Sequence, residues 1–272
     1  MQNREYRMRP SRWASASLGT LMGAWFAESL FPCVRLVRLR ATCLATVVCL
    51  GAAAPAAPQT PQPAADINRD FLDPDLDPEA WLGRFEVESR EVFAARRSLL
   101  TAVGLKPGDR VVDIGSGTGL FVAPFSKATG PTGRVYAVDI SPKLVAFVEQ
   151  RVKKEQLPNV AVALSTPTSI GLPPGSINQA FACDVYHHFE HHEAMLATIF
   201  TAMTPGGSFV VVDFERIPGV SREWLLGHVR ADKATVRHEI ERAGFDFLEE
   251  VTIPEFRENY CLRFRKPGKA AP

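Results

Sequence analysis

The chain has 272 residues, of which 46% are hydrophobic and 22% are charged, proportions that are ordinary for a folded globular protein. They exclude wholesale disorder and a fibrous architecture, and the length allows one full domain with an extension, or two small domains. The net charge of +1 is uneven: residues 1–40 carry +5 and residues 41–65 carry none, so residues 66–272 carry −4. A mildly acidic domain without a block of Lys or Arg is not expected to bind nucleic acid.

The first seventy residues have the composition of a targeting segment. Three arginines between positions 35 and 40 precede an uncharged apolar run over 41–54, and a Pro/Ala-rich stretch follows. This order predicts a signal peptide and linker over residues 34–70, and hence an exported, periplasmic or secreted protein. The run is shorter than the roughly 20 residues that cross a bilayer, so no stable membrane span is expected in the mature chain. Residues 1–33 are interpreted as a start-site artefact or a disordered extension, and the alternative for the whole segment is a disordered tail on a cytoplasmic protein.

From residue 71 onward the pattern is that of an alternating α/β domain. Apolar spacing typical of a helix occupies residues 88–103. Short apolar strands are predicted at 110–115, 133–139, 159–164, 178–183 and 208–213, with helices at 120–129, 142–156, 192–203 and 233–243. Two last strands, near 247–252 and 260–265, are expected to form a hairpin, which makes one strand antiparallel. The sequence therefore predicts a Rossmann-like, mostly parallel sheet of seven strands over residues 71–272, with helices on both faces.

A glycine-rich turn follows the first predicted strand. The run Val111-Val-Asp113-Ile-Gly115-Ser-Gly117-Thr-Gly119 has the spacing G-x-G-x-G, and the second strand ends in Asp139. Glycines at such a turn permit positive φ and let backbone N–H groups approach a ligand. An acidic side chain at the end of the second strand can accept both hydroxyls of a ribose. The sequence therefore predicts a nucleoside-type ligand at the carboxyl ends of the strands.

Together these residues resemble the class I S-adenosylmethionine-dependent methyltransferases over about residues 80–265. The resemblance implies that S-adenosylmethionine is the cofactor and that its methionine part is wrapped by the loop of Gly115, Ser116, Gly117, Thr118 and Gly119. It further implies that Asp113 lies near the amino group, that Asp139 binds the ribose and that Ile140 lines the adenine. Where the family usually has an acidic residue after the third strand, this chain has Ser165 and Thr166, which are expected to substitute for it.

An ionisable run, Asp184-Val-Tyr186-His187-His188-Phe-Glu190-His191-His192, follows the fourth predicted strand. In the family this position faces the reactive methyl, so Asp184 is expected to contact the cofactor. Because an ordinary histidine pKa of about 6.5 suits proton transfer, His187 is the first and His188 the second expected general base. Tyr186 is expected to hold the methyl acceptor. No metal is predicted, although two alternatives stay open: metal ligation by His187 with His191 and by His188 with His192, or solvated histidines at the start of the next helix.

The run and the segments after it resemble the small-molecule branch related to quinone C-methyltransferases. The sequence thus predicts a methyltransferase that acts on an unidentified small molecule. Residues 224–233 and 258–260 are expected near that substrate. One alternative is a catalytically inactive regulatory protein that binds S-adenosylmethionine. The other is a nicotinamide-dependent oxidoreductase, which Leu120 disfavours because it stands where the third glycine of the dinucleotide spacing would fall.

Overall fold

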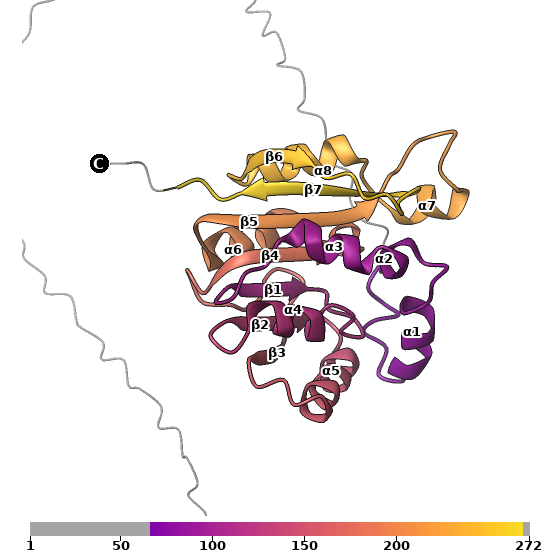
Figure 1. Ribbon diagram of the computed structural model, residues 1–272. Helices are drawn as coiled ribbons and strands as arrows, with labels where there is room; N and C mark the ends of the chain where they lie inside the picture. Colours follow the sequence, from indigo (N-terminus) through magenta and orange to yellow (C-terminus); the bar gives the residue numbers. More distant parts are fainter. Residues whose placement is uncertain (1–65, 269–272) are drawn as a thin grey trace, which may run out of the picture. The chain divides into compact units, whose positions relative to one another are not determined.

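A computed structural model describes residues 66–268 (Figure 1). The predicted signal peptide and most of its linker lie outside the described residues, and only the last five linker residues, 66–70, are included. The helices are α1 (Pro78–Phe85), α2 (Glu91–Ala94), α3 (Arg96–Val103), α4 (Val122–Thr129), α5 (Pro142–Lys154), α6 (His192–Ala202), α7 (Glu223–His228) and α8 (Lys233–Arg242), with a 3-10 turn η1 (Tyr186–His188). The strands are β1 (Arg110–Ile114), β2 (Arg134–Asp139), β3 (Val160–Leu164), β4 (Ile177–Cys183), β5 (Met203–Phe214), β6 (Asp246–Glu250) and β7 (Asn259–Arg265).

The strands form one sheet in the order β3-β2-β1-β4-β5-β7-β6. Strands β1 to β5 are parallel, and β7 pairs antiparallel with both β5 and β6. The predicted seven-stranded sheet with an antiparallel C-terminal strand is therefore confirmed. From β1 the chain moves outward through β2 and β3 and then returns to the other side of β1 with β4. Open α/β sheets bind ligands where the strand order reverses, which here is at the carboxyl ends of β1 and β4.

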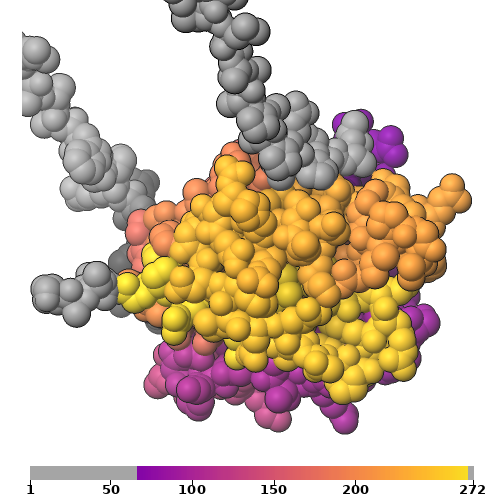
Figure 2. All heavy atoms as spheres, turned by 90° about the horizontal axis from the view of Figure 1, so that it is seen from above, coloured from indigo at the N-terminus to yellow at the C-terminus, as the bar shows by residue number. Residues whose placement is uncertain are grey.

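Helices cover both faces of the sheet (Figure 1). Neighbouring β1 residues point to opposite faces, so Val112 is buried in a cluster with residues of α6 and α8, while Val111 is buried with residues of α3 and α4. Seen from the side of the edge strand β6, the surface is formed mainly by C-terminal residues coloured orange to yellow (Figure 2). None of the helices within residues 66–268 has both the length and the apolar character needed to cross a membrane.

Capping residues fix where several helices begin. The Ser141 hydroxyl accepts a hydrogen bond from the Leu144 N–H, and Pro142 occupies the first position of α5, where its missing N–H costs little. The Asp232 carboxylate caps α8 in the same way through the Thr235 N–H. Because Ser141 comes two residues after the last residue of β2, this cap holds the start of α5 against the carboxyl end of the sheet.

Three helical segments differ from the sequence prediction. The helix predicted over residues 88–103 is divided at Ala95 into α2 and α3, since Ala95 has φ −80° and ψ 2°. The helices α1 and α7 were not predicted, because their eight and six residues are too short to show a clear helical period. Helix α1 begins with a capping residue and a proline: the Asp77 carboxylate accepts from the Glu79 N–H, and Pro78 is the first residue of the helix.

Candidate active site

A pocket lies at the carboxyl ends of β1, β2 and β4, where the strand order reverses. Its volume is about 940 Å³, including the part that is open to solvent. Three carboxylates line it: Asp113 in β1, Asp139 at the end of β2 and Asp184 directly after β4. Most of the predicted site residues form its wall, namely Asp113, Gly115, Ser116, Gly117, Thr118, Asp139, Ile140, Ser165, Thr166, Asp184 and His188. The structure therefore brings together side chains that the sequence analysis assigned to one site.

The glycine loop needs glycine at its first position because of a close contact. Gly115 has φ +65°, and a Cβ atom there would lie 2.3 Å from Cγ2 of Val185. The Gly115 N–H donates to the Val138 carbonyl at 2.8 Å, which fixes the loop to the end of β2. Gly119 lies outside the pocket wall and faces α5, where a Cβ would be 3.3 Å from Val148. The structure thus gives Gly119 a packing position instead of the expected contact with the cofactor.

Asp139 links the glycine loop to the start of α5. Its Oδ2 accepts from the Gly117 N–H at 2.8 Å and its Oδ1 accepts from the Ser141 N–H at 2.9 Å. Burial raises the pKa of this carboxyl, and the backbone N–H groups of Ser141, Gly117 and Ile140 work against that rise. Each carboxylate oxygen can accept more than one hydrogen bond, so Asp139 retains the capacity to bind a ligand hydroxyl while it shapes the loop.

Two buried polar groups beside the loop have no hydrogen-bond partner within the described part of the chain: Oδ2 of Asp113 and Oγ of Ser116. Asp113 is only 3% exposed. Its burial, together with the nearby Asp139 carboxylate, raises the pKa of the Asp113 carboxyl to about 8. Buried polar groups without partners are costly and rare in folded proteins. Their position in the pocket wall fits a site that a polar, cationic ligand group completes.

Ser165 and Thr166, which follow β3, line the pocket at the position where the family that the sequence resembles usually has an acidic residue. The Ser165 N–H donates to the Asp139 carbonyl at 2.8 Å, and the Thr166 N–H donates to the Ser169 carbonyl at 2.9 Å. These bonds fix the backbone and leave the side chains of Ser165 and Thr166 at the pocket wall. A ligand at this point gains neutral hydrogen bonds, which are weaker than bonds to a charged group.

Residues before β1 cover the pocket, a contribution that the sequence analysis did not identify. Phe71 and Phe85 line the pocket, and the ring of Trp81 lies 4.8 Å from the first and 5.1 Å from the second between ring centroids. The Glu86 carboxylate accepts from the Thr118 hydroxyl at 2.9 Å, which ties the end of α1 to the glycine loop. The sequence contained one signal for this cover, namely three aromatic residues in and around a short Asp/Pro-rich stretch.

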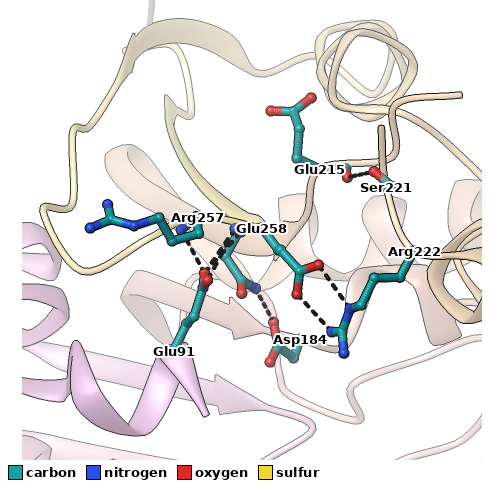
Figure 3. A network of polar contacts seen from close by, with 8 residues as sticks. Glu91, Asp184, Glu215, Ser221, Arg222, Arg257 and Glu258 are labelled. Carbon is teal, nitrogen blue, oxygen red and sulfur yellow. Dashed lines mark hydrogen bonds and ion pairs between the residues drawn. The ribbon is translucent and has the colours of Figure 1, made fainter. Parts of the chain in front are cut away.

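Asp184 is held from two sides. Its Oδ2 lies 2.7 Å from Nη2 of Arg90, and its Oδ1 accepts from the Asn259 amide at 2.7 Å. Burial raises the pKa of the Asp184 carboxyl, and the Arg90 guanidinium works against that rise. Figure 3 shows the surrounding network, in which the Glu91 carboxylate accepts from the backbone N–H groups of residues 257–259. Segment 258–260 thereby contacts Asp184 in the pocket wall through Asn259, and the Glu91 carboxylate of α2 is bonded to the start of β7.

Tyr186 points away from the pocket. It is fully buried, and its hydroxyl donates to Oε2 of Glu239 at 2.8 Å. Glu239 also forms a bidentate pair with Arg230, at 2.7 and 2.6 Å. These contacts place Tyr186 in a buried network with α8 and do not support the expected contact with a methyl acceptor. In a 3-10 turn, successive side chains point about 120° apart, so only one of the three residues of η1 can face the pocket directly.

His188 is the residue of η1 that lines the pocket. Its Nδ1 lies 3.2 Å from Oδ1 of Asn68. Burial, and secondarily His187 and His228, lower the pKa of His188 to about 2, so the ring is neutral and accepts a proton poorly at neutral pH. This argues against His188 as the general base.

His187 is not part of the pocket wall and is only 4% exposed. Its Nδ1 lies 2.7 Å from Oδ1 of Asp213, and its backbone N–H donates to Oδ2 of Asp213 at 2.9 Å.

The histidine pairs four residues apart do not form the metal site considered as an alternative. The turn η1 ends at His188 and α6 begins at His192, so the run is not one helix. His191 is exposed, and Nε2 of His192 lies 3.6 Å from Oε1 of Glu239 in the buried network. A different histidine, His228 of α7, approaches η1, with its ring centroid 5.0 Å from that of His187 and 5.3 Å from that of His188. The expected proximity of segment 224–233 to the site thus involves His228.

Comparison with known proteins shows that the chain is similar to methyltransferases. The sequence profile of a family described as a methyltransferase domain matches residues 112–211. A ubiquinone/menaquinone biosynthesis C-methyltransferase, UbiE, from Cupriavidus taiwanensis is 30% identical over 122 residues, which are 43% of this chain and 48% of the relative. The chain thus spans about half the length of the curated relatives that it matches.

Two solved structures share the fold. A SAM-dependent methyltransferase from Aquifex aeolicus superimposes with a TM-score of 0.60 and 22% identity, covering 70% of this chain and 98% of the other. Phosphoethanolamine N-methyltransferase 2 from Haemonchus contortus, in complex with S-adenosyl-L-methionine, gives a TM-score of 0.61 with 18% identity and covers 73% and 60% of the two chains. At these identities the likeness concerns the fold alone.

Proposed function

We propose that this chain, a member of the class I S-adenosylmethionine-dependent methyltransferase family, binds S-adenosylmethionine in the pocket and transfers its methyl group to a small molecule. The observation that carries the proposal is the unpartnered Asp113 carboxyl and Ser116 hydroxyl beside a glycine loop at the carboxyl end of the sheet. Buried polar groups seldom lack a partner, and these two lie together in the wall of the pocket.

The residues present fit this cofactor group by group. Asp113 would accept from the cationic amino group of the methionine part, and Ser116 with the backbone of Gly117 would hold the rest of that part. Asp139 would accept from the ribose hydroxyls, with Ile140, Ser165 and Thr166 around the adenine. When bound, S-adenosylmethionine supplies an electrophilic methyl on a sulfonium. The chain contributes chiefly orientation, because such a displacement needs no covalent help from the protein.

The acceptor would lie at the other end of the pocket, between the cover of Phe71 and Phe85 and the polar pair of His188 and Asn68. Aromatic walls favour an apolar body of limited size, and a few polar groups at one end fix its orientation. The aromatic cover of Phe71 and Phe85 over this end supports a small molecule over a macromolecular acceptor. The proposal includes a small acceptor with a polar atom directed toward His188.

Calorimetric titration of the full chain with S-adenosylmethionine, S-adenosylhomocysteine and the nicotinamide dinucleotides tests the cofactor. We expect one site for each of the first two ligands and no heat from the dinucleotides. Asp113→Asn should weaken binding of S-adenosylmethionine, whereas the control Asp109→Asn should not, because Asp109 lies beside the other end of β1. Heat from the dinucleotides alone would overturn the assignment. If S-adenosylmethionine binds but no S-adenosylhomocysteine forms when a set of small acceptors is added, the result would favour the non-catalytic alternative.

A further inference from the structure

Three histidines from two separate segments meet beside the pocket. His187 and His188 belong to η1, and His228 is the last residue of α7. One ring nitrogen from each can be chosen so that all three atoms lie within 4.8 Å of one another. A gathering of three imidazoles is the ligand set of many catalytic zinc sites. We propose that His187, His188 and His228 together bind a divalent transition-metal ion, with Zn²⁺ the best match.

The hydrogen bonds around the three rings are those that metal ligands need. Nδ1 of His187 is 2.7 Å from the buried Asp213 carboxylate, so this nitrogen carries the proton and Nε2 is free to bind an ion. The Nδ1 of His188 lies 3.2 Å from Oδ1 of Asn68, which favours the proton on Nδ1 and makes Nε2 the nitrogen that would bind an ion. A carboxylate or amide oxygen behind a histidine fixes the tautomer and the ring orientation of a ligand. Two of the three rings therefore have their outer partners in place.

Coordination needs only a small closing movement. Ligand nitrogens around a tetrahedral zinc ion, at 2.0–2.1 Å from it, are about 3.3 Å apart, so the three nitrogens that lie within 4.8 Å of one another must approach by up to about 1.5 Å. His228 can supply this movement, because it ends the six-residue helix α7 and is only half-buried, whereas His187 is locked by Asp213. The ring of Trp224, stacked on His228 with centroids 5.1 Å apart, shields the outer side of the group.

Neutral imidazole suits Zn²⁺, Cu²⁺, Ni²⁺ and Fe²⁺ and does not suit Mg²⁺ or Ca²⁺, which prefer oxygen. Three protein ligands leave one position of a tetrahedral ion open to water or to an oxygen of a small molecule. His188 is shared between the metal group and the pocket wall, so the open position adjoins the acceptor end of the pocket. The inference concerns ion binding by three side chains and does not depend on methyl transfer.

The test uses the full chain without a polyhistidine tag, freed of metal by a chelator. We expect one equivalent of Co²⁺ to bind with the visible absorption of a nitrogen-ligated site and to be displaced by one equivalent of Zn²⁺. Loss of an outer partner commonly costs 10–100-fold in metal affinity, so His228→Ala, which removes a ligand, should cost at least about 100-fold. His191→Ala is the matched control: this exposed histidine of the same loop should leave the affinity unchanged.

Circular dichroism verifies that each variant folds, and Asp213→Asn provides a second variant that keeps all three histidines, with an expected loss of about 10–100-fold. No stoichiometric Co²⁺ binding, unchanged binding in folded His228→Ala, or equal loss in His191→Ala would overturn the metal site. Titration of the same samples with S-adenosylmethionine keeps the two proposals apart. If the chain binds the ion but not S-adenosylmethionine, the metal site stands and the proposed function fails. If it binds S-adenosylmethionine but not the ion, the proposed function stands and the metal site fails.

Discussion

The proposed cofactor half of the pocket (residues 113–119, 139–140 and 165–166) and the proposed acceptor half (Asn68, His188 and the cover around Phe71) are assembled in different ways. The first consists of short stretches at the ends of adjacent parallel strands, and its bonds are mostly backbone N–H groups meeting Asp139. The second joins segments such as Asn68 and His188, which are 120 positions apart. A half built from strand ends is fixed by the sheet, whereas the other half depends on how distant loops pack.

The largest expected effect is on the cofactor half, at Gly115→Ala. The added Cβ would lie 2.3 Å from Val185 at a φ of +65°, so backbone strain and overpacking together should lower the free energy of unfolding by about 2–5 kcal/mol. Thermal unfolding and calorimetry measure this loss and the accompanying loss of cofactor binding. Gly219→Ala is the control: its φ is +78° but the space around it is open, so it should show only the strain, about 1–2 kcal/mol. Equal losses in both variants would contradict the close contact.

The next effect is a pH dependence of cofactor affinity. With its pKa at about 8, the free Asp113 carboxyl is protonated at pH 6–7, and it must lose that proton to pair with a cationic amino group. The ratio of the wild-type to the Asp113→Asn association constant should therefore rise with pH, by up to about tenfold per unit between pH 6 and 8. Calorimetry in buffers of different ionisation enthalpy should show the proton leaving. A ratio that stays constant over this range would rule out the raised pKa.

In the acceptor half, Asn68→Ala should loosen η1 without affecting the cofactor. The Asn68 amide donates to the His188 carbonyl at 3.0 Å and to the Glu190 carboxylate at 2.8 Å, so its removal should cost about 1–2 kcal/mol. Faster hydrogen exchange at residues 186–190, with cofactor affinity unchanged within about twofold, is the expected result. Asn178→Ala, which loses bonds to Asp109 and the Arg110 N–H beside the other end of β1, should leave that exchange unchanged. Weaker cofactor binding in Asn68→Ala would mean that the halves are not separable in this way.

The smallest effect is expected at the rim. Arg222 forms a bidentate pair with Glu258 at 2.8 and 2.6 Å, but the Arg222 side chain is 64% exposed (Figure 3). Exposed pairs contribute about 0–1 kcal/mol and are screened by salt. Arg222→Ala should therefore change the free energy of unfolding by less than about 1 kcal/mol, measured by urea denaturation at low and high salt. A larger loss would show that the network in Figure 3 supports the cover of the pocket.

The same difference explains what the sequence could predict. The alternation of strands and helices along the chain and the glycine loop are local patterns, so the seven-stranded sheet and most of the residues that line the pocket around the loop were predicted. Gly119 lies outside the pocket wall and near α5, and spacing alone does not distinguish a glycine that faces a pocket from one that faces a helix. The orientation of Tyr186 depends on the rotation of a 3-10 turn, which three residues do not encode. Asn68 was missed, and His228 was expected near the substrate only as part of segment 224–233, because only the packing of loops far apart in the sequence brings them to His188.

The contact between Gly115 and Val185 has a consequence for how two ligands would share the pocket. Val185 directly precedes η1 and occupies the space that a Cβ atom at Gly115 would need, so the glycine loop and the turn that carries His187 and His188 are close neighbours. We expect a shift of the glycine loop at Gly115 to reach η1 through the Val185 side chain. Occupancy at one end should therefore alter affinity at the opposite end, and thermodynamic reciprocity requires the same coupling factor in both directions.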